Sequence, residues 1–428
     1  MADFDAIVVG SGCAGSVAAY ELARAGKSVL VIERGNSAGA KNMTGGRIYS
    51  HSLKKVFPDF EIHAPLERKI THERISMLSP DANCTVDFTS AAMNETGKDS
   101  YTVLRAVFDP WLAQQAEDAG AEYIYGIAVE DLIEQDGKII GVMAGEDEIT
   151  ADVVVLCDGV NSLLTEKAVG FKRPAASALA VGIKQIIELP ERVIDDRLLC
   201  AQGEGAAWLF AGDATCGHVG GGFMYTNKAS ISLGLVATIS DAATSDIPVY
   251  QMLENFKAHP AVAPLIRGGR VLEHSGHMVP EGGLDMMCDL VGDGVMVAGE
   301  SAMMCVNLGY LVRGMDYAIA AGMHAGQCAA RALDAGDTSK AGLQCYVDAL
   351  NESFVLKDLK QFRRFPHFME STPRMFNEYP ALVRDVMNEM FVVDGQPVKP
   401  LKKSIMPLVK NIGMMNLLKD VRGGMKAL

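Results

Sequence analysis

The sequence predicts an α/β fold: a Rossmann-like dinucleotide-binding domain with an inserted β-rich domain and a helical C-terminal region. Three observations predict it. From Asp5 the chain reads as strand, glycine turn, helix and strand, DAIVVGSGCAGSVAAYELARAGKSVLVIERG. Residues 176–280 are rich in strand-like segments separated by glycine turns. From about residue 336 the hydrophobic pattern is helical.

The first turn has the pattern of a dinucleotide-binding loop. Gly10, Gly12 and Gly15 form GxGxxG between a β-branched strand and a small-residue helix. The first glycine permits the tight turn, the second lets a pyrophosphate approach the helix N-terminus, and the third allows close packing. Glu33 ends the next strand, where it can accept hydrogen bonds from ribose hydroxyls and would repel a 2′-phosphate. The pattern therefore disfavours NADP, and it does not separate FAD from NAD.

A second glycine turn lies in VAGESAMMCVNLGYLVRGMD, which begins at Val297. A strand ends at Gly299, Glu300 follows, and a small-residue turn leads to a predicted helix over Met315–Leu333. Such a turn lets backbone N–H groups approach a polar ligand. No second GxGxxG occurs, and the glycine run at Gly220–Gly222 has no helix after it. A separate NAD(P)H domain is therefore not indicated.

The segments around these turns supply the other expected elements. FDPWLAQQAEDA predicts a helix over Phe108–Ala119, with Asp109 as N-cap and Pro110 at the first helical position. A hairpin is expected at Gly126–Ile133 and Ile139–Ala144, around a DGK turn. Single strands are expected at 153–156, 180–187, 230–238 and 290–298.

The composition excludes several classes of protein. A net charge of -14 lacks the basic footprint of duplex binding, so no nucleic-acid partner is expected. No signal peptide is expected in MADFDAIVVG, and no apolar run reaches the length of a membrane span. The nine cysteines include no CxxC pair and none beyond Cys345, which argues against a zinc ribbon or a cysteine-ligated cluster. Scattered cysteines of this kind predict reduced, mostly buried thiols in a cytoplasmic protein.

Several polar residues outside the two turns are candidates for chemistry. His274 and His277 have HxxH spacing, but no third ligand accompanies them and no metal is expected. Glu281 in PEGG either faces a ligand pocket or belongs to a turn. Tyr225 either lines the substrate side or is an ordinary strand aromatic. Arg313 either stabilises negative charge on a cofactor or pairs with a carboxylate. The sequence has no convincing nucleophile arrangement, so Glu281, Arg313 and Tyr225 are the catalytic candidates.

Eight segments, in order, resemble one family of flavoproteins. They are VVGSGCAGSVAA, AGAKNMTGGRIY, LRAVFDPWLAQQAEDAGA, VVLCDGVNSLL, GGGFMYTNKASISLGLV, GHMVPEGG, DGVMVAGESAMMCVNLGYLVRGMDYAIAAG and SFVLKDLKQFRRFPHF. The chain resembles the FixC group, relatives of electron-transfer-flavoprotein:quinone oxidoreductase within the geranylgeranyl reductase and aromatic hydroxylase superfamily. The resemblance implies FAD. It also implies why there are two turns, because one extended cofactor is held at its ADP end by the first and at its ribityl and flavin end by the second.

The resemblance also implies which residues hold the cofactor. The expected set is Gly10, Gly12, Cys13, Ala14, Gly15, Glu33, Arg34, Gly45, Gly46, Arg105, Val129, Asp158, Gly159, Gly299, Glu300, Asn307, Leu308 and Gly309. The chain departs from the family where GDAAG is replaced by GESAM at 299–303. Glu300 is one methylene longer than aspartate, and Met303 puts a bulky side chain where backbone is expected to approach the cofactor. This departure is expected to bear on FAD affinity.

The expected domain plan is discontinuous. The FAD-binding domain comprises 1–75, 99–175 and 281–335, the β-rich domain on the substrate or quinone side comprises 76–98 and 176–280, and the helical C-terminal region comprises 336–428. Its tail, Lys399–Leu428, has seven Lys and Arg residues against the single Asp420, a net of +6. This basic amphipathic tail either binds a membrane surface or an acidic ferredoxin, or packs on the acidic body of its own chain.

By resemblance, the protein is an FAD-dependent oxidoreductase that takes electrons from an electron-transfer flavoprotein and passes them toward a quinone or a ferredoxin-like partner. The expected partners are the electron-transfer-flavoprotein subunits, a separate ferredoxin-like protein and a quinone at a membrane surface. The expected location is the cytoplasm, with peripheral contact to the inner membrane face. Two other reactions suit the same fold: NAD(P)H- or ferredoxin-dependent reduction of a lipid double bond, and hydroxylation by a monooxygenase. A further hypothesis is a subunit whose GESAM loop no longer holds FAD.

Overall fold

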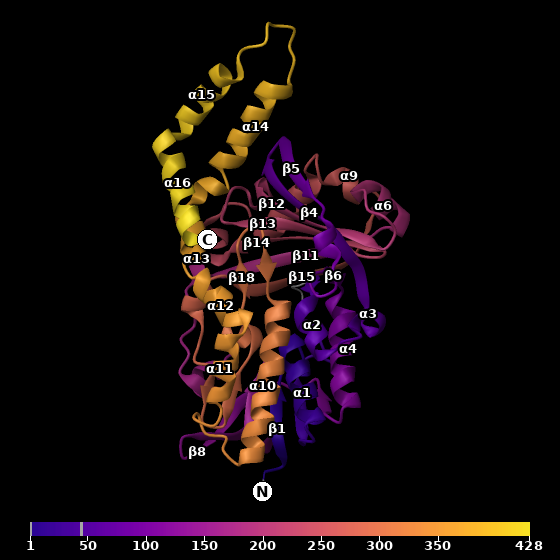
Figure 1. Cartoon of the computed structure of the whole chain (residues 1–428), viewed down its shortest axis with the longest axis vertical. Helices are drawn as coiled ribbons and strands as arrows, with labels where there is room; N and C mark the ends of the chain where they lie inside the picture. Colours follow the sequence, from indigo (N-terminus) through magenta and orange to yellow (C-terminus); the bar gives the residue numbers. More distant parts are fainter. Residues whose placement is uncertain (1, 43–45) are drawn as a thin grey trace.

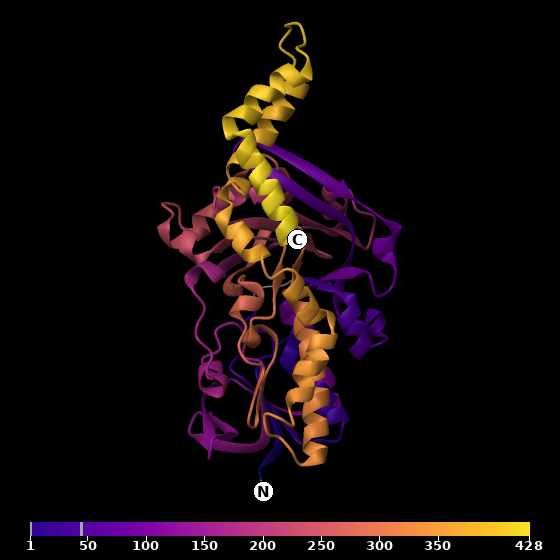
Figure 2. The ribbon, with the colours of Figure 1, turned by 60° about the vertical axis from the view of Figure 1, so that its left-hand side comes forward.

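The computed structural model describes residues 2–42 and 46–428 (Figure 1). An eight-stranded sheet and a nine-stranded sheet form the body of the described chain. The N-terminus lies at one end of the molecule, and an arm of C-terminal helices projects from the other end (Figures 1 and 2).

The first sheet has the order β16–β17–β10–β1–β2–β7, with the hairpin β8–β9 attached to β10. The strands from β17 to β7 are parallel to one another. The bounds are β1 Phe4–Val9, β2 Val29–Glu33, β7 Glu122–Tyr125, β8 Val129–Gln135, β9 Lys138–Ala144, β10 Asp147–Leu156, β16 Val291–Gly292 and β17 Val295–Val297. The central strands are continuous hydrophobic runs because helices cover them. Two of these helices, α1 Cys13–Arg24 and α10 Met315–Ala335, pack against each other.

The second sheet has the order β15–β11–β14–β13–β12–β4–β6–β3, with β5 beside β4. The bounds are β3 Arg47–Tyr49, β4 Leu66–Ser79, β5 Ala82–Phe88, β6 Ser100–Val103, β11 Leu179–Glu188, β12 Glu204–Gly212, β13 Gly220–Thr226, β14 Ser230–Thr238 and β15 Arg270–Pro280. One face packs on α8 Val249–Ala258, through residues such as Ile183, Ile187 and Phe256. Because side chains alternate along a strand, the even-numbered residues of β11 point to the opposite face of the second sheet, away from α8.

The other helices are α2 Ser50–Val56, α3 Phe60–His63, α4 Arg105–Asp118, α5 Leu164–Val169, α6 Glu191–Leu198, α7 Ile239–Thr244, α9 Ala263–Ile266, α11 Gln344–Glu352, α12 Phe354–Gln361, α13 Phe365–Ser371, α14 Glu378–Phe391, α15 Leu401–Ile412 and α16 Met414–Ala427. A small ribbon pairs β18 Val306–Asn307 with β19 Val312–Arg313. Helices α14 and α15 form the projecting arm (Figure 2). None of the described helices has the length and apolar character needed to cross a bilayer.

Most of the predicted elements are confirmed, and two details are wrong. Asp109 does not cap a helix, because α4 already begins at Arg105 and Asp109 lies inside it, bonded to Arg105 one turn earlier. The segment 290–298 is not one strand. A turn at Gly294, whose φ is +75°, folds it into the antiparallel pair β16 and β17.

Strand β4 bears on the expected domain boundary between residues 75 and 76. That boundary falls inside β4, which runs from Leu66 to Ser79 and pairs along its length with strands of the second sheet. The strands β3 and β6 also belong to this sheet. The second sheet therefore includes more residues of the N-terminal segment than the strand-like composition of that segment predicts.

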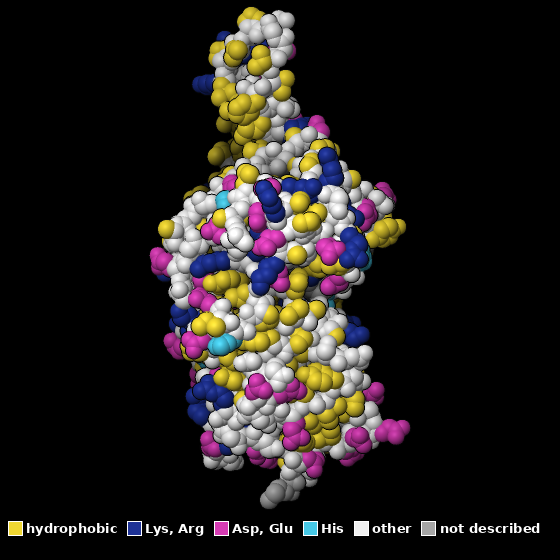
Figure 3. All heavy atoms as spheres, turned by 90° about the vertical axis from the view of Figure 1, so that its right-hand side faces the viewer, with side chains coloured by type: hydrophobic (Ala, Val, Ile, Leu, Met, Phe, Trp, Pro, Cys, Tyr) yellow, Lys and Arg dark blue, Asp and Glu magenta, His cyan; other side chains and the backbone are white. Residues whose placement is uncertain are grey.

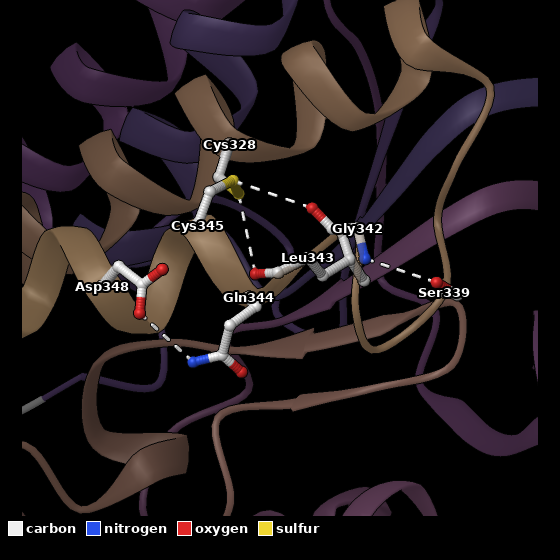
Figure 4. The surroundings of a disulfide bond; sticks show 7 residues. All are labelled: Cys328, Ser339, Gly342, Leu343, Gln344, Cys345 and Asp348. Atoms are coloured by element: carbon white, nitrogen blue, oxygen red, sulfur yellow. Dashed lines mark hydrogen bonds between the residues drawn. A yellow bond between two sulfur atoms is a disulfide. The ribbon is translucent and has the colours of Figure 1, made fainter.

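Two cysteines form a disulfide, which the sequence did not predict. Cys328 of α10 and Cys345 of α11 have Cα atoms 6.0 Å apart and are bonded to each other (Figure 4). The expectation of reduced thiols is therefore wrong for this pair, while the seven other cysteines, all among the described residues, are free. Their spacing in sequence gives no signal, because the pair meets only when α11 folds back along α10.

Candidate functional site: a dinucleotide cleft and an adjoining cavity

Backbone contacts fix the glycine loop between β1 and α1. Gly10 has a φ of +97°, and a Cβ on it would lie 2.4 Å from the carbonyl oxygen of Cys157. A Cβ on Gly15 would lie 1.9 Å from the carbonyl oxygen of Gly10. Both distances are far below van der Waals contact, so the fold itself requires these two glycines.

Gly12 has space around it. A Cβ built on it would meet Asn42 Nδ2 at 3.6 Å and Arg105 Nη2 at 3.9 Å, which are ordinary contact distances. The open space lies at the N-terminus of α1, where free N–H groups and the positive end of the helix dipole attract an anion. A guanidinium nearby adds to this attraction. The missing Cβ at Gly12 therefore leaves a cradle of the kind that a pyrophosphate occupies.

Glu33 ends β2 and is buried. Its Oε2 accepts a hydrogen bond from the N–H of Ser11 at 2.9 Å, and its Oε1 accepts one from the N–H of Gly35 at 2.6 Å. Each carboxylate oxygen keeps a further lone pair for a ribose hydroxyl. The N–H of Ile127 donates to the backbone oxygen of Glu33 at 3.2 Å, which brings the segment leading to Val129 to the same edge.

A buried ion pair positions the guanidinium beside the loop. Arg105 donates from Nε and Nη2 to the two carboxylate oxygens of Asp109, each at 2.6 Å, and Asn42 Nδ2 donates to the same carboxylate at 2.8 Å. Asp109 is fully buried. Burial raises the pKa of the neighbouring Cys13 thiol to about 12, so this cysteine is neutral and fills space.

The second turn lies directly against the first. A Cβ on Gly299 would lie 2.9 Å from the Cβ of Ala14 in α1. Ser301 donates from Oγ to Asp158 Oδ1 at 2.9 Å and accepts the N–H of Gly159 at 2.8 Å. Ser301, part of the unusual GESAM sequence, therefore ties the two halves of the cleft together. The two turns therefore lie close enough for a single extended cofactor to contact both.

A cavity of about 550 Å³ lies between the second turn and the second sheet. Its wall on the side of the turn includes Glu281, Glu300, Asn307, Leu308 and Gly309. Its wall on the sheet includes Met77, Leu209, Phe223, Tyr225 and Val236. These sheet residues belong to the face that points away from α8. The cavity has the size and the mixed apolar and polar lining of a small-molecule site.

Met303 does not occupy this space. Its side chain is 2% exposed and packs with Val160, Leu179 and Met286 in a separate hydrophobic cluster. Of the described residues that line the cavity, the GESAM sequence contributes Glu300. Its Oε2 lies 3.8 Å from Nε2 of His277. The bulky methionine is therefore placed away from the cavity.

Two of the three catalytic candidates lie at the cavity. A Cβ on Gly46 would lie 3.3 Å from the Tyr225 ring, and Gly45 lies outside the described residues. Burial raises the pKa of the Tyr225 phenol to about 12, so it is neutral near pH 7. Glu281 accepts a hydrogen bond from Asn307 Nδ2 at 3.1 Å. Tyr225 lies on β13 and lines the cavity.

The third candidate, Arg313, is bound elsewhere. It donates from Nε to Asp316 at 2.8 Å and from Nη1 to Asp358 at 2.8 Å. His51 contacts both Asp316 and Arg313. Arg313 is thus paired with carboxylates, and it is not among the described residues that line the cavity.

The HxxH pair does not converge on a metal. His274 and His277 are three residues apart on β15, so they point to opposite faces of the sheet. His274 Nδ1 lies 3.0 Å from Gln185 Nε2. Within 2–42 and 46–428, no three potential metal-ligating side chains are grouped.

Two cations near the cavity were missed by the sequence analysis. Arg47 of β3 lines the cavity and donates to Glu73 Oε2 at 2.9 Å. Lys184 of β11 is 4% exposed, and burial lowers its pKa. It shares a strand face with Gly182, which lines the cavity. The sequence signal that could have identified Lys184 is a basic residue inside an otherwise strand-like run, VGIKQIIEL.

The geometry defines a class of protein first: a dinucleotide-binding protein with a ligand cavity beside its second glycine turn. Residues 3–196 match the FAD binding domain family, and residues 365–428 match the ETF-QO/FixC family C-terminal domain. The chain is 51% identical over 425 residues to the probable electron transfer flavoprotein-quinone oxidoreductase YdiS of Escherichia coli (strain K12), covering 99% of each chain. It is 49% identical over 425 residues to protein FixC of the same organism, again covering 99% of each. The chain therefore belongs to the ETF-QO/FixC family and is an FAD-dependent oxidoreductase.

Solved structures share the fold at low identity. A geranylgeranyl bacteriochlorophyll reductase-like protein from Thermoplasma acidophilum aligns with a TM-score of 0.72 at 17% identity, over 98% of this chain and 99% of that one. The flavin-dependent brominase Bmp2 aligns with a TM-score of 0.64 at 16% identity, over 97% of this chain and 99% of that one. At these identities the likeness establishes the fold alone.

The described residues fit FAD. The cradle at Gly12, the N-terminus of α1 and Arg105 suit its pyrophosphate, and Glu33 suits the adenosine ribose. Glu300, Asn307 and the residues around them suit its ribityl and flavin end. Bound FAD would supply reversible uptake of two electrons at this site.

Proposed function

We propose that this oxidoreductase takes electrons from an electron-transfer flavoprotein and passes them through FAD to a quinone bound in the cavity. The observation that carries the proposal is the cavity itself, which joins the flavin-end residues to an apolar sheet face. The name of the YdiS relative adds support, since it pairs an electron transfer flavoprotein with a quinone.

The cavity walls suit a flat, partly apolar acceptor. Ile75, Met77, Leu209 and Phe223 offer apolar surface on the sheet side. The polar groups opposite them, Glu281 among them, come from the segments that adjoin the cofactor. A ring held between these walls would lie next to the flavin, which suits electron transfer without a covalent step.

A separate ferredoxin-like protein is a further proposed partner. The sequence has no CxxC pair and no cysteine after Cys345. For a cysteine-ligated cluster on the electron path, the partner that we propose is this ferredoxin-like protein.

The test is an anaerobic absorbance experiment on the purified holoprotein. We expect its flavin bands to persist after NADH or NADPH, to bleach with a reduced electron-transfer flavoprotein, and to return on adding a water-soluble quinone. Rapid bleaching by NAD(P)H alone would contradict the proposal and favour a double-bond reductase or a hydroxylase. A colourless protein that takes up no FAD would contradict the cofactor site.

We also propose that the projecting arm touches a membrane surface. The tip between α14 and α15 exposes apolar side chains, which Figure 3 shows along the arm. They include Phe391 (72% exposed), Val393 (83%) and Val398 (92%). Lys399, Lys402 and Lys403 are exposed next to them. Apolar side chains rimmed by lysines suit the interface of an anionic bilayer.

The alternative, in which the tail packs on the rest of its own chain, applies to only part of the tail. Helix α15 has no buried residue, whereas α16 buries Asp420 against Arg374 and Tyr379. Deleting the whole tail would therefore remove body contacts as well, so a substitution at the tip is the sharper test.

The tip test is co-sedimentation with anionic vesicles. We expect the double variant Phe391→Ser, Val393→Ser to lose vesicle binding while keeping its FAD. Ile62→Ser, at a residue 78% exposed in α3 on the body, is the matched control and should bind as wild type does. Equal binding by all three proteins would refute membrane contact through the arm, and loss of ferredoxin capture instead would assign the tip to a protein partner.

A further inference from the structure

Glu281 stands between two cavities. It follows β15, and its N–H is fixed by the backbone oxygen of Ala178 at 2.9 Å. It lines the large cavity described above. It also lines a second cavity of about 10 Å³, whose other walls include Leu359, Phe362 and Pro366 of the α12–α13 segment. That volume is about what one water molecule needs.

The carboxyl group of Glu281 has no counter-ion. Asn307 donates to it, and among the described residues no Lys, Arg or His lies within ion-pair distance of it. Burial raises its pKa. Compared with a surface glutamate, it holds its proton to higher pH.

Other titratable groups also line the cavity: Tyr225, Asp285, Glu300, Cys305, Tyr310, His367 and Glu370. Burial raises the pKa of Tyr225 to about 12 and that of Cys305 well above its usual range. Glu300 lies 3.8 Å from a histidine, and Asp285 is paired with Arg363 at 2.6 Å. Among the described carboxyl groups that line the large cavity, Glu281 is the one that also lines the small cavity, and burial raises its pKa.

Quinone reduction needs such a donor. A quinone takes up two electrons and two protons when it becomes a quinol. Two-electron-reduced FAD that holds one proton would supply two electrons and one proton, so a second proton would have to come from the protein. That proton must reach a quinone oxygen inside the cavity.

We infer that Glu281 is this proton donor and that it is reloaded through the small cavity behind it. The O–H bond of the carboxyl breaks as an O–H bond forms on the quinone, leaving Glu281 as a carboxylate. A water in the small cavity then returns a proton from solvent, and the hydrogen bond from Asn307 stabilises the carboxylate meanwhile. The inference rests on the proposed quinone acceptor.

Two acceptors separate proton donation from an effect on the cofactor. The photoreduced holoprotein is mixed with a short-chain quinone, or with ferricenium, which accepts one electron and no proton. We expect Glu281→Gln to slow reoxidation by quinone on the order of 100-fold or more and to leave reoxidation by ferricenium unchanged. Glu281→Asp should restore part of the quinone rate. Glu273→Gln, at an exposed glutamate on β15, is the control and should match wild type.

The outcomes are distinct. Equal slowing with both acceptors would make Glu281 a positioning residue for the cofactor, and an unchanged quinone rate would remove any role; either result overturns the inference. A wild-type protein that ferricenium oxidises and quinone does not would instead refute the proposed acceptor. An independent readout is the infrared band of protonated carboxyl groups, followed against pH. Burial also raises the pKa of Asp158, so we expect one component of this band to be lost in Glu281→Gln and kept in Glu273→Gln; identical bands in all three proteins would also overturn the inference.

Discussion

Substituting alanine at Gly12 separates the cofactor's requirements from those of the fold. The added Cβ would meet its neighbours at 3.6 and 3.9 Å, and the backbone φ of −86° suits alanine. Loss of chain entropy in the unfolded state favours the variant by about 0.4–1 kcal/mol. Alanine at an N-cap position costs about the same amount relative to glycine. We therefore expect the free energy of unfolding of the apoprotein to change by less than about 1 kcal/mol.

FAD binding should respond differently. The new methyl group would stand where the pyrophosphate approaches the backbone, and a mismatch of one methyl group costs roughly 1–3 kcal/mol. The expected result is a 10- to 100-fold weaker Kd, on the order of what that energy gives. The assay is a titration of apoprotein with FAD followed by flavin fluorescence, beside urea unfolding of the same samples.

Two control variants are measured beside Gly12→Ala. Gly276→Ala on β15, where a Cβ would meet a backbone oxygen at 3.6 Å, adds the same methyl group away from the loop and should change neither quantity. Gly15→Ala should fail to fold, because its Cβ would lie 1.9 Å from a backbone oxygen. Wild-type FAD affinity in Gly12→Ala would refute the placement of the pyrophosphate, and unfolding of this variant would refute the packing argument.

Three further predictions concern stability and redox state. Asp109→Ala should lower the free energy of unfolding by about 3–5 kcal/mol in urea, because it breaks the buried ion pair with Arg105, while Asp118→Ala on the exposed side of α4 should have little effect. Hydrogen bonding from Arg374 lowers the pKa of Asp420, so its contribution to stability is present above the ordinary aspartate pKa of about 3.9 and is lost as the pH falls through the folded-state value. Asp420→Asn should thus loosen α16 toward protease near pH 7 and match wild type in acid; a difference that persists in acid would count against this. Thiol titration of the denatured, unreduced protein should find seven thiols, and nine would contradict the disulfide between α10 and α11.

The cofactor end of the site was predictable because its signals are local. The spacing of Gly10, Gly12 and Gly15 follows from one turn between one strand and one helix, and Glu33 ends the next strand. Likewise, the alternation over Ser230–Thr238 reports a strand that the structure gives with the same bounds. Patterns of this kind depend on neighbours within a few residues, so a single chain reveals them.

The partners of individual side chains were not predictable. Ser301 looked like a departure from the family sequence, yet in the fold it binds Asp158 and Gly159 across the junction of the two turns. The sequence left two interpretations open for Arg313. Its ion pair with Asp358 forms only because α12 packs near α10. Such contacts join segments far apart in sequence, and no periodicity records them.

The sequence by itself determined the class of fold, the dinucleotide loop and, through eight resembling segments, the family and its FAD. Tertiary structure decided that the two turns lie against each other, that Met303 points away from the cavity, and that Glu281 faces it. It also brought Cys328 and Cys345 together. The physical reason is the same in each case. Local spacing sets strands, turns and helices, whereas the neighbours of a buried side chain are set by how those elements pack.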